Sequence, residues 1–95
     1  MWQLREGTHP LLTDEGGAIL NEHTGRWTYL TPTGAAAVLA LLATTDVDQA
    51  AVQYAAVYGL PRERAAADVR AVADSLTTQG LVRTQPSRRR RGWRR

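Results

Sequence analysis

The sequence predicts an α+β domain in which a three-stranded antiparallel sheet precedes three helices. Up to residue 30, short apolar runs alternate with turns rich in glycine, asparagine and aspartate, which is typical of strands joined by hairpins. From residue 32 onward, alanine, valine and leucine recur at intervals of three and four residues, which is typical of helices. The 95 residues are enough for one domain. A domain of this size buries only about 60–65% of its unfolded surface, so a deep catalytic cavity is not expected.

The strands are expected near residues 10–13, 17–21 and 26–30. Side chains alternate along a strand, so in the third one Trp27 and Tyr29 share one face while Thr28 and Leu30 share the other. One face is expected to pack on the helices and the other to be partly exposed. The two aromatic rings either cover the sheet or belong to a binding surface, and the sequence leaves both interpretations open. Alternation of apolar and polar residues over 2–5 also allows a short N-terminal strand.

The first helix is expected to start at Pro32, behind Thr31 as the capping residue, because a proline at the first helical position loses no hydrogen bond. Its residues up to Leu42 are almost all apolar, so the helix is expected to be nearly wholly buried. The second helix is expected from about 46 to 58 and the third from 61 or 62 to 79, each followed by a glycine that can end it.

Two local features of the later helices are also readable. Either of two neighbouring residues resembles the cap of the second helix, Thr45 or Asp46. The third helix carries an apolar stripe of five residues at helical spacing, namely Ala65, Val69, Val72, Ala73 and Leu76.

Charge divides the chain into two parts. All 12 basic residues are arginines, and six of them lie in the last eight positions, so residues 1–87 carry six arginines against nine acidic residues, a formal net charge of −3. The last residues show no apolar period. We therefore expect a folded domain over 1–83 and a disordered, arginine-rich tail over 84–95.

The sequence lacks the residues that several kinds of chemistry require. There is no cysteine, and the two histidines, His9 and His23, lie apart in loop-like surroundings, so no cofactor and no metal site are expected. The serines and carboxylates show no triad order or paired-acid spacing, which argues against an enzyme. No segment approaches the roughly 20 apolar residues that cross a bilayer, and the N-terminus lacks signal-peptide character. A cytoplasmic protein without membrane contact is expected.

The order of elements is winged helix-turn-helix-like, and several short motifs together resemble a known family. These are Leu12-Thr13-Asp14, Ala18-Ile19-Leu20-Asn21, Thr24-Gly25-Arg26-Trp27, Leu30-Thr31-Pro32-Thr33-Gly34-Ala35 and Gly80-Leu81-Val82. They are similar to PqqD-like precursor-peptide recognition elements (RiPP recognition elements), in the stand-alone form found in lasso-peptide biosynthesis. The resemblance covers residues 9 to 83. Thr31 replaces the usual asparagine but keeps the capping chemistry, and the arginine-rich tail is not part of the family pattern.

The resemblance implies an adaptor that is not an enzyme. In such proteins the leader segment of a ribosomally made precursor peptide adds as an extra strand to the third strand, in a groove against the third helix. The adaptor then presents the precursor to a leader peptidase, a cysteine protease-like partner, and downstream to a macrolactam-forming cyclase. The residues expected to bind the peptide come from the third strand and the third helix: Arg26, Trp27, Thr28, Tyr29, Leu30, Ala66, Val69, Arg70, Val72, Ala73 and Leu76. For Val69, Val72 and Leu76, a purely structural role in the core remains open.

The alternative is a nucleic-acid-binding winged helix, in which the tail would contact phosphates. The third helix would then read the nucleic acid. Its charges argue against that role, because Arg62, Arg64 and Arg70 are balanced by Glu63, Asp68 and Asp74. A helix without net charge on an acidic body fits a phosphate-lined groove poorly.

Overall fold

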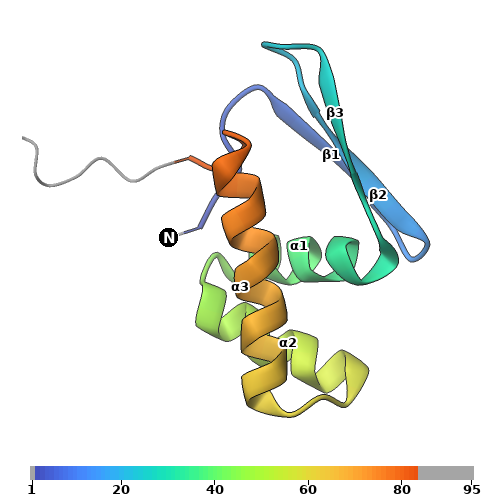
Figure 1. Cartoon of the computed structure of the whole chain (residues 1–95), viewed down its shortest axis with the longest axis vertical. Coiled ribbons are helices and arrows are strands. Elements are labelled where there is room, and N and C mark those ends of the chain that lie inside the picture. The colour runs from blue at the N-terminus through green and yellow to red at the C-terminus, as the bar shows by residue number, and fades with distance from the viewer. Residues whose placement is uncertain (1, 84–95) are drawn as a thin grey trace, which may run out of the picture.

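The computed structural model describes residues 2–83, and its six elements confirm the predicted α+β class and the predicted order (Figure 1). Three strands, β1 (Thr8–Thr13), β2 (Gly16–Asn21) and β3 (Arg26–Leu30), are followed by three helices, α1 (Pro32–Thr44), α2 (Val47–Tyr58) and α3 (Arg62–Thr78). The first strand begins two residues earlier than predicted. The predicted disordered tail over 84–95 lies outside the described residues. No helix among the described residues is both long and apolar enough to span a membrane.

The sheet is antiparallel, with β2 in the middle and β1 and β3 at its edges. Ile19 of β2 lies opposite Pro10 on one side and Thr28 on the other, and its side chain is fully buried. Because side chains alternate, the face that carries Ile19, Thr28 and Leu30 is turned towards the helices. Trp27 and Tyr29 therefore lie on the opposite, outer face of the sheet.

Local capping explains where the first two helices begin. The hydroxyl of Thr31 accepts a hydrogen bond from the backbone N–H of Gly34 at 3.1 Å, with Pro32 as the first helical residue. Of the two candidate caps for α2, Asp46 takes the role, because its carboxylate accepts from the backbone N–H of Gln49 at 3.2 Å. Thr45 instead ends α1 in the left-handed conformation, with φ of 57°.

The core joins the sheet to all three helices. Its largest fully buried side chains are Ile19, Val38, Leu41, Val69, Leu76 and Leu81. The N-terminal segment closes this core, since the backbone N–H of Trp2 donates to the carbonyl of Thr45 and Leu4 forms a single antiparallel bridge with Val82. The possible N-terminal strand is thus reduced to that one bridge. Figure 1 shows the C-terminal end of α3 returning to the level of the sheet.

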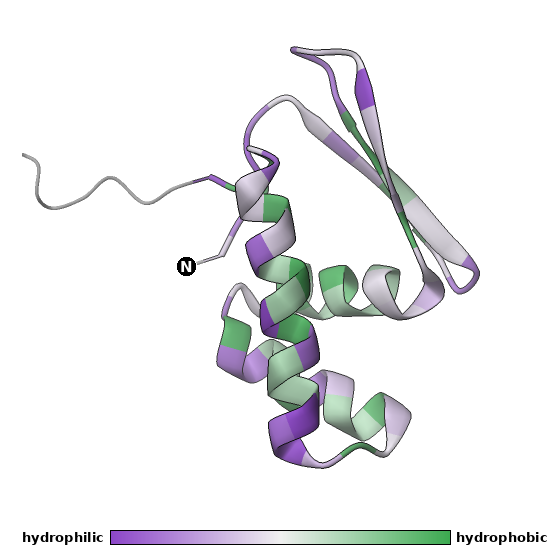
Figure 2. Ribbon diagram, viewed as in Figure 1, coloured by the Kyte–Doolittle hydropathy of each residue, from purple (hydrophilic) through white to green (hydrophobic). Residues whose placement is uncertain are grey.

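The prediction that the first helix is nearly wholly buried is wrong. Residues such as Val38 and Leu41 are fully buried, yet the side chain of Leu39 is 46% exposed and Ala43 is also exposed. A domain of this size has one core, so only one side of an apolar helix can be covered. Figure 2 shows apolar residues along much of α1. The helix therefore presents an uncovered apolar side to solvent.

Candidate functional site

The edge strand β3 and the C-terminal half of α3 are joined by side chains. The hydroxyl of Thr28 donates to the Oε1 atom of Gln79 at 2.8 Å, and the Nε2 atom of Gln79 donates to the hydroxyl of Ser75 at 3.2 Å. This short chain of hydrogen bonds fixes the end of the helix beside the edge of the sheet. These hydrogen bonds therefore also determine the width of the space between β3 and α3.

A groove runs between β3 and α3. Its central part has a volume of about 290 Å³, and it continues into adjoining parts of about 250 Å³ and 130 Å³. The parts adjoin one another, since the linings of the first and second share Ala71 and Val72 among others, and those of the first and third share Thr28 and Gln79. We call this the β3/α3 groove. The residues that line its central part are Thr28, Tyr29, Leu30, Thr31, Gly34, Ala71, Val72, Ser75, Leu76 and Gln79.

The two edges of the sheet differ in their capacity to accept another strand. An edge offers backbone N–H and C=O groups for pairing, and a proline removes one N–H from that row. The edge strand β1 contains Pro10, whereas β3, residues 26–30, contains no proline. The β3 edge is therefore the better template for an incoming strand, and it is the edge that borders the groove.

Part of the predicted site is brought together in this groove. Thr28, Tyr29, Leu30, Val72 and Leu76 contribute to its central lining, and Arg26 lines the adjoining part of about 130 Å³. The side chain of Leu76 is only 1% exposed, so it forms the floor of the groove and also belongs to the core.

The other predicted residues lie elsewhere or deeper. Val69 and Ala73 are buried in the core, and Ala66 is half-buried beside it. Arg70 points towards α2, where its guanidinium lies 3.6 Å from the carboxylate of Asp48. Trp27 is 47% exposed on the outer face of the sheet. None of these five lines the β3/α3 groove as described.

Some lining residues were missed by the sequence interpretation, namely Thr31, Gly34, Ala71, Ser75 and Gln79. Those on α3 and at its C-cap follow one another at intervals of four residues, at positions 71, 75 and 79, with Val72 alongside. They form a row of small and polar side chains next to the buried stripe. That spacing can be recognised in the sequence, but only the position of β3 in the structure shows that the row borders a groove.

The groove is charged at its ends and neutral between them. Arg26 lies in the end formed with the β2–β3 turn, and Asp68, which is 3.8 Å from Arg64, lies in the other end. Tyr54 lines the same end as Asp68, and its pKa is raised above the ordinary value of a tyrosine, first by burial and then by the charge of Asp68. The described residues contain no cluster of three or more side chains able to hold a metal ion.

Besides the β3/α3 groove, the face of the sheet that is turned away from the helices exposes apolar side chains near β3. Tyr29 is 79% exposed, and the register places it in line with Ala18 and Leu11, while Trp27 lies in line with Leu20. We define the outer sheet face by these five residues. A large exposed apolar patch is typical of a surface that contacts another molecule.

An open strand edge beside a groove lined by a helix defines a small α+β binding module. The chain belongs to the PqqD family, because the model for coenzyme PQQ synthesis protein D matches residues 16–82. No curated protein matches the chain.

Two solved structures share the fold. The first, a lasso peptide synthetase B1 complexed with the leader peptide, is 26% identical and has a TM-score of 0.75, covering 87% of this chain and 98% of its own. The second, TbiB1 in complex with the TbiA(beta) leader peptide, has a TM-score of 0.74 and covers 90% of this chain and 99% of its own. Its identity is 17%, which supports the fold alone.

Proposed function

We propose that the protein is a leader-peptide-binding adaptor of lasso-peptide biosynthesis and not an enzyme. It takes an extended leader segment as a fourth strand on the open edge of β3, with side chains of that segment in the β3/α3 groove. The observation that carries the proposal is the proline-free edge next to this groove, in a PqqD-family chain 26% identical to a lasso peptide synthetase B1 solved with a leader peptide.

Strand addition supplies affinity and selectivity from different groups. Each backbone hydrogen bond to the β3 edge contributes about 0.5–1.5 kcal/mol net, with little dependence on the guest sequence. Every second side chain of the guest would face α3, where Leu30, Val72 and Leu76 offer an apolar site. We expect that site to select an apolar guest residue.

A partner protein would need a surface that the bound leader leaves free. With a guest strand on β3, the outer sheet face is still exposed and is lengthened by the guest's outward side chains. We propose that the leader peptidase, a cysteine protease-like protein, docks on this face, and that the cyclase is a possible later partner. An adaptor for ribosomally made peptides is expected in the cytoplasm.

Nucleic-acid binding through α3 is not favoured. Arg64 lies 3.8 Å from Asp68, and Arg70 lies 3.6 Å from Asp48, so these two cations already have acidic neighbours. A helix that binds in a nucleic-acid groove would instead need arginines that are available to contact phosphates.

A pair of matched substitutions tests the peptide site. Peptides are selected on the protein from a displayed library of random 20-residue sequences, and the best one is labelled for fluorescence anisotropy. We expect Val72→Asp to weaken its binding at least about tenfold, since one carboxylate then replaces an apolar contact in the groove. Ala67→Asp adds the same charge to an exposed position of α3 outside the lining and serves as the control. Failure to select any peptide, or equal losses in both variants, would reject the proposal.

A further inference from the structure

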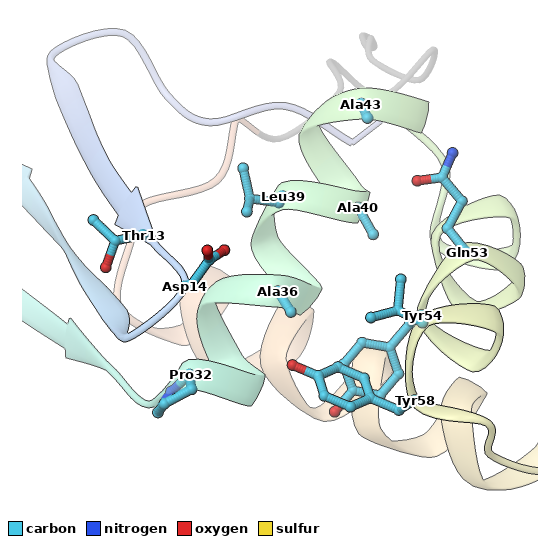
Figure 3. A pocket seen from close by; sticks show the side chains of 11 residues that line it. Thr13, Asp14, Pro32, Ala36, Leu39, Ala40, Ala43, Gln53, Tyr54 and Tyr58 are labelled. Carbon is cyan, nitrogen blue, oxygen red and sulfur yellow. The ribbon is translucent and has the colours of Figure 1, made fainter.

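A second cavity lies apart from the central part of the β3/α3 groove. It lies between α1 and α2 and has a volume of about 530 Å³ (Figure 3). We call it the α1/α2 groove. Its lining consists of Thr13, Asp14, Pro32, Ala36, Leu39, Ala40, Ala43, Gln53, Tyr54, Val57 and Tyr58. Strand addition to β3 makes no use of it.

The α1/α2 groove is apolar and open to solvent. Its floor is formed by small residues of α1 such as Ala36 and Ala40, which leave room between the helices. Leu39 is 46% exposed and Val57 is 72% exposed. Asp14 is the one charged residue in the described lining. Such a groove accepts apolar side chains, with a preference for a basic residue where the guest passes Asp14.

Tyr54, whose side chain is only 5% exposed, borders both grooves. This residue lines the α1/α2 groove and also the end of the β3/α3 groove, together with Thr31 and Thr33. Pro32, which lies between these two threonines in sequence, belongs to the lining of the α1/α2 groove. Figure 3 shows Pro32 near one end of that groove, with Tyr54 and Tyr58 close to the first turn of α1. A peptide that left β3 beyond Leu30 would have to pass around this first turn to reach the α1/α2 groove.

We propose that the α1/α2 groove is a second subsite for the same peptide that adds to β3. Residues of the peptide beyond those paired with Leu30 pass Tyr54 and place apolar side chains between α1 and α2. This inference rests on the proposed function, because the β3/α3 groove must hold the first segment of the guest.

The dimensions suit a short extension. The lining runs along α1 from Pro32 to Ala43, which at 1.5 Å per residue corresponds to roughly 17 Å of helix axis. About five to six extended residues cover that length. Since the first segment is already bound, the extension binds as a tethered group at high effective concentration, and a few apolar contacts suffice.

Peptide length tests the proposal. The peptide selected above is shortened to the smallest segment that still binds, and this core segment is then extended by six residues of its own sequence at either end. We expect one of the two extended forms to bind about tenfold more tightly than the core segment, which is the gain from burying one large apolar side chain. The other form should bind like the core segment.

Substitutions at exposed positions test whether the gain in affinity comes from the α1/α2 groove. Val57→Glu and Leu39→Glu should each return the tighter extended form to the affinity of the core segment, and neither should alter binding of the core segment itself. Val52→Glu is the matched control, because Val52 lies on α2, is 47% exposed and is outside the lining. Circular dichroism tests whether all three variants keep the fold.

The outcomes separate this inference from the proposed function. Equal affinities of the core segment and both extended forms, or the same loss for Val57→Glu and Val52→Glu, would overturn the second subsite. In either case, the proposed β3 site is retained if Val72→Asp still weakens binding of the core segment. If no peptide bound the protein at all, both proposals would fall together.

Discussion

At the scale of single residues, Gly16 fixes how closely the β1–β2 turn approaches the end of β3. Its φ is +129°, and a Cβ atom placed on it would lie 2.6 Å from the carbonyl oxygen of Leu30. That oxygen is part of the backbone and cannot rotate away as a flexible side chain would. Gly25 offers a comparison, because its φ of +74° is also positive but a Cβ atom there would meet nothing within 4 Å.

The two glycines give a matched prediction for stability. We expect Gly25→Ala to cost about 1–2 kcal/mol, which is the backbone cost of a left-handed residue with a side chain. Gly16→Ala adds a steric clash to its own backbone strain and should lower the free energy of unfolding by a larger amount. Urea denaturation of both variants measures the difference. Equal midpoints would mean that the turn moves away from Leu30 at no cost.

A second residue-scale feature is the pair of His9 and Glu22, whose side chains are 2.5 Å apart at the exposed end of β1 and β2. The pKa of Glu22 is lowered from 4.5, first by the hydrogen bond with His9 and then by the positive charge of that ring. A carboxyl group whose pKa is lowered by folding stabilises the fold above its unfolded pKa. That stabilisation is lost as the pH falls through the lowered value.

This linkage predicts a small pH-dependent difference. At pH 6 the parent protein should have a higher Tm than Glu22→Gln, and the difference should shrink as the pH falls below 4.5 towards 3. It should be small because both side chains are exposed. Thermal unfolding across this range measures it, with Glu15→Gln in the β1–β2 turn as the control. A difference that persists unchanged at pH 3 would exclude the carboxylate as its source.

At the scale of elements, α3 divides its apolar residues between two tasks. Val69, Ala73 and Leu76 are buried in the core, whereas Val72 is half-buried and borders the β3/α3 groove. The sequence places all four in one stripe. Helical periodicity locates an apolar side but cannot say what packs on either flank of it. The division depends on where β3 lies, and β3 reaches α3 through the contact of Thr28 with Gln79, 51 positions apart in the sequence.

Stability and affinity should therefore separate on this helix. Leu76→Ala removes a side chain that is 1% exposed and should cost about 2–5 kcal/mol of unfolding free energy. Val72→Ala leaves a smaller void at a solvent-facing position, so it should cost much less stability while weakening the library-selected peptide. Urea denaturation and fluorescence anisotropy on the same samples measure the two quantities. Equal destabilisation by the two variants would contradict the assignment of Val72 to the groove.

Local signals explain which elements were predictable. The capping hydroxyl of Thr31 and the proline at position 32 mark the start of α1, and the alternation of side chains marks β3. The predicted start of α1 and the predicted bounds of β3 therefore agree with the structure almost to the residue. Thr45 was harder, because a threonine in the left-handed conformation has no sequence signal comparable to that of glycine. The linings of both grooves depend on contacts between distant segments. For that reason, Ala71, Ser75 and Gln79 were found only in the structure.

At the scale of the whole molecule, the size of the domain decides what stays exposed. The composition of α1 suggested a buried helix, but one core cannot cover all its sides. The uncovered side forms the α1/α2 groove with α2, and the uncovered face of the sheet carries Trp27 and Tyr29. The sequence left open whether these rings cover the sheet or bind a peptide; in the structure both lie on the outer sheet face, and Tyr29 also borders the β3/α3 groove. The described residues thus expose three surfaces with apolar side chains, which are the β3/α3 groove, the α1/α2 groove and the outer sheet face.

The distribution of charge over the whole chain gives the last prediction. Residues 1–83 contain six arginines and nine acidic residues, while six further arginines follow at 88–91, 94 and 95. If those six arginines drive any nucleic-acid binding, the logarithm of the affinity for duplex DNA should fall with the logarithm of the salt concentration with a slope of up to about −5. Peptide binding by strand addition should change little over the same range, because it depends on backbone hydrogen bonds and apolar contacts.

Replacing the six C-terminal arginines by glutamine keeps the length of the chain and removes only their charge. We expect this variant to lose DNA binding and to bind the library-selected peptide as tightly as the parent protein. Anisotropy titrations with a labelled 20-base-pair duplex and with the labelled peptide, from 50 to 500 mM NaCl, compare the two ligands directly. DNA binding that survived the replacement would require cations of the folded domain and would revive the winged-helix alternative. Loss of peptide binding would instead make the tail part of the peptide site.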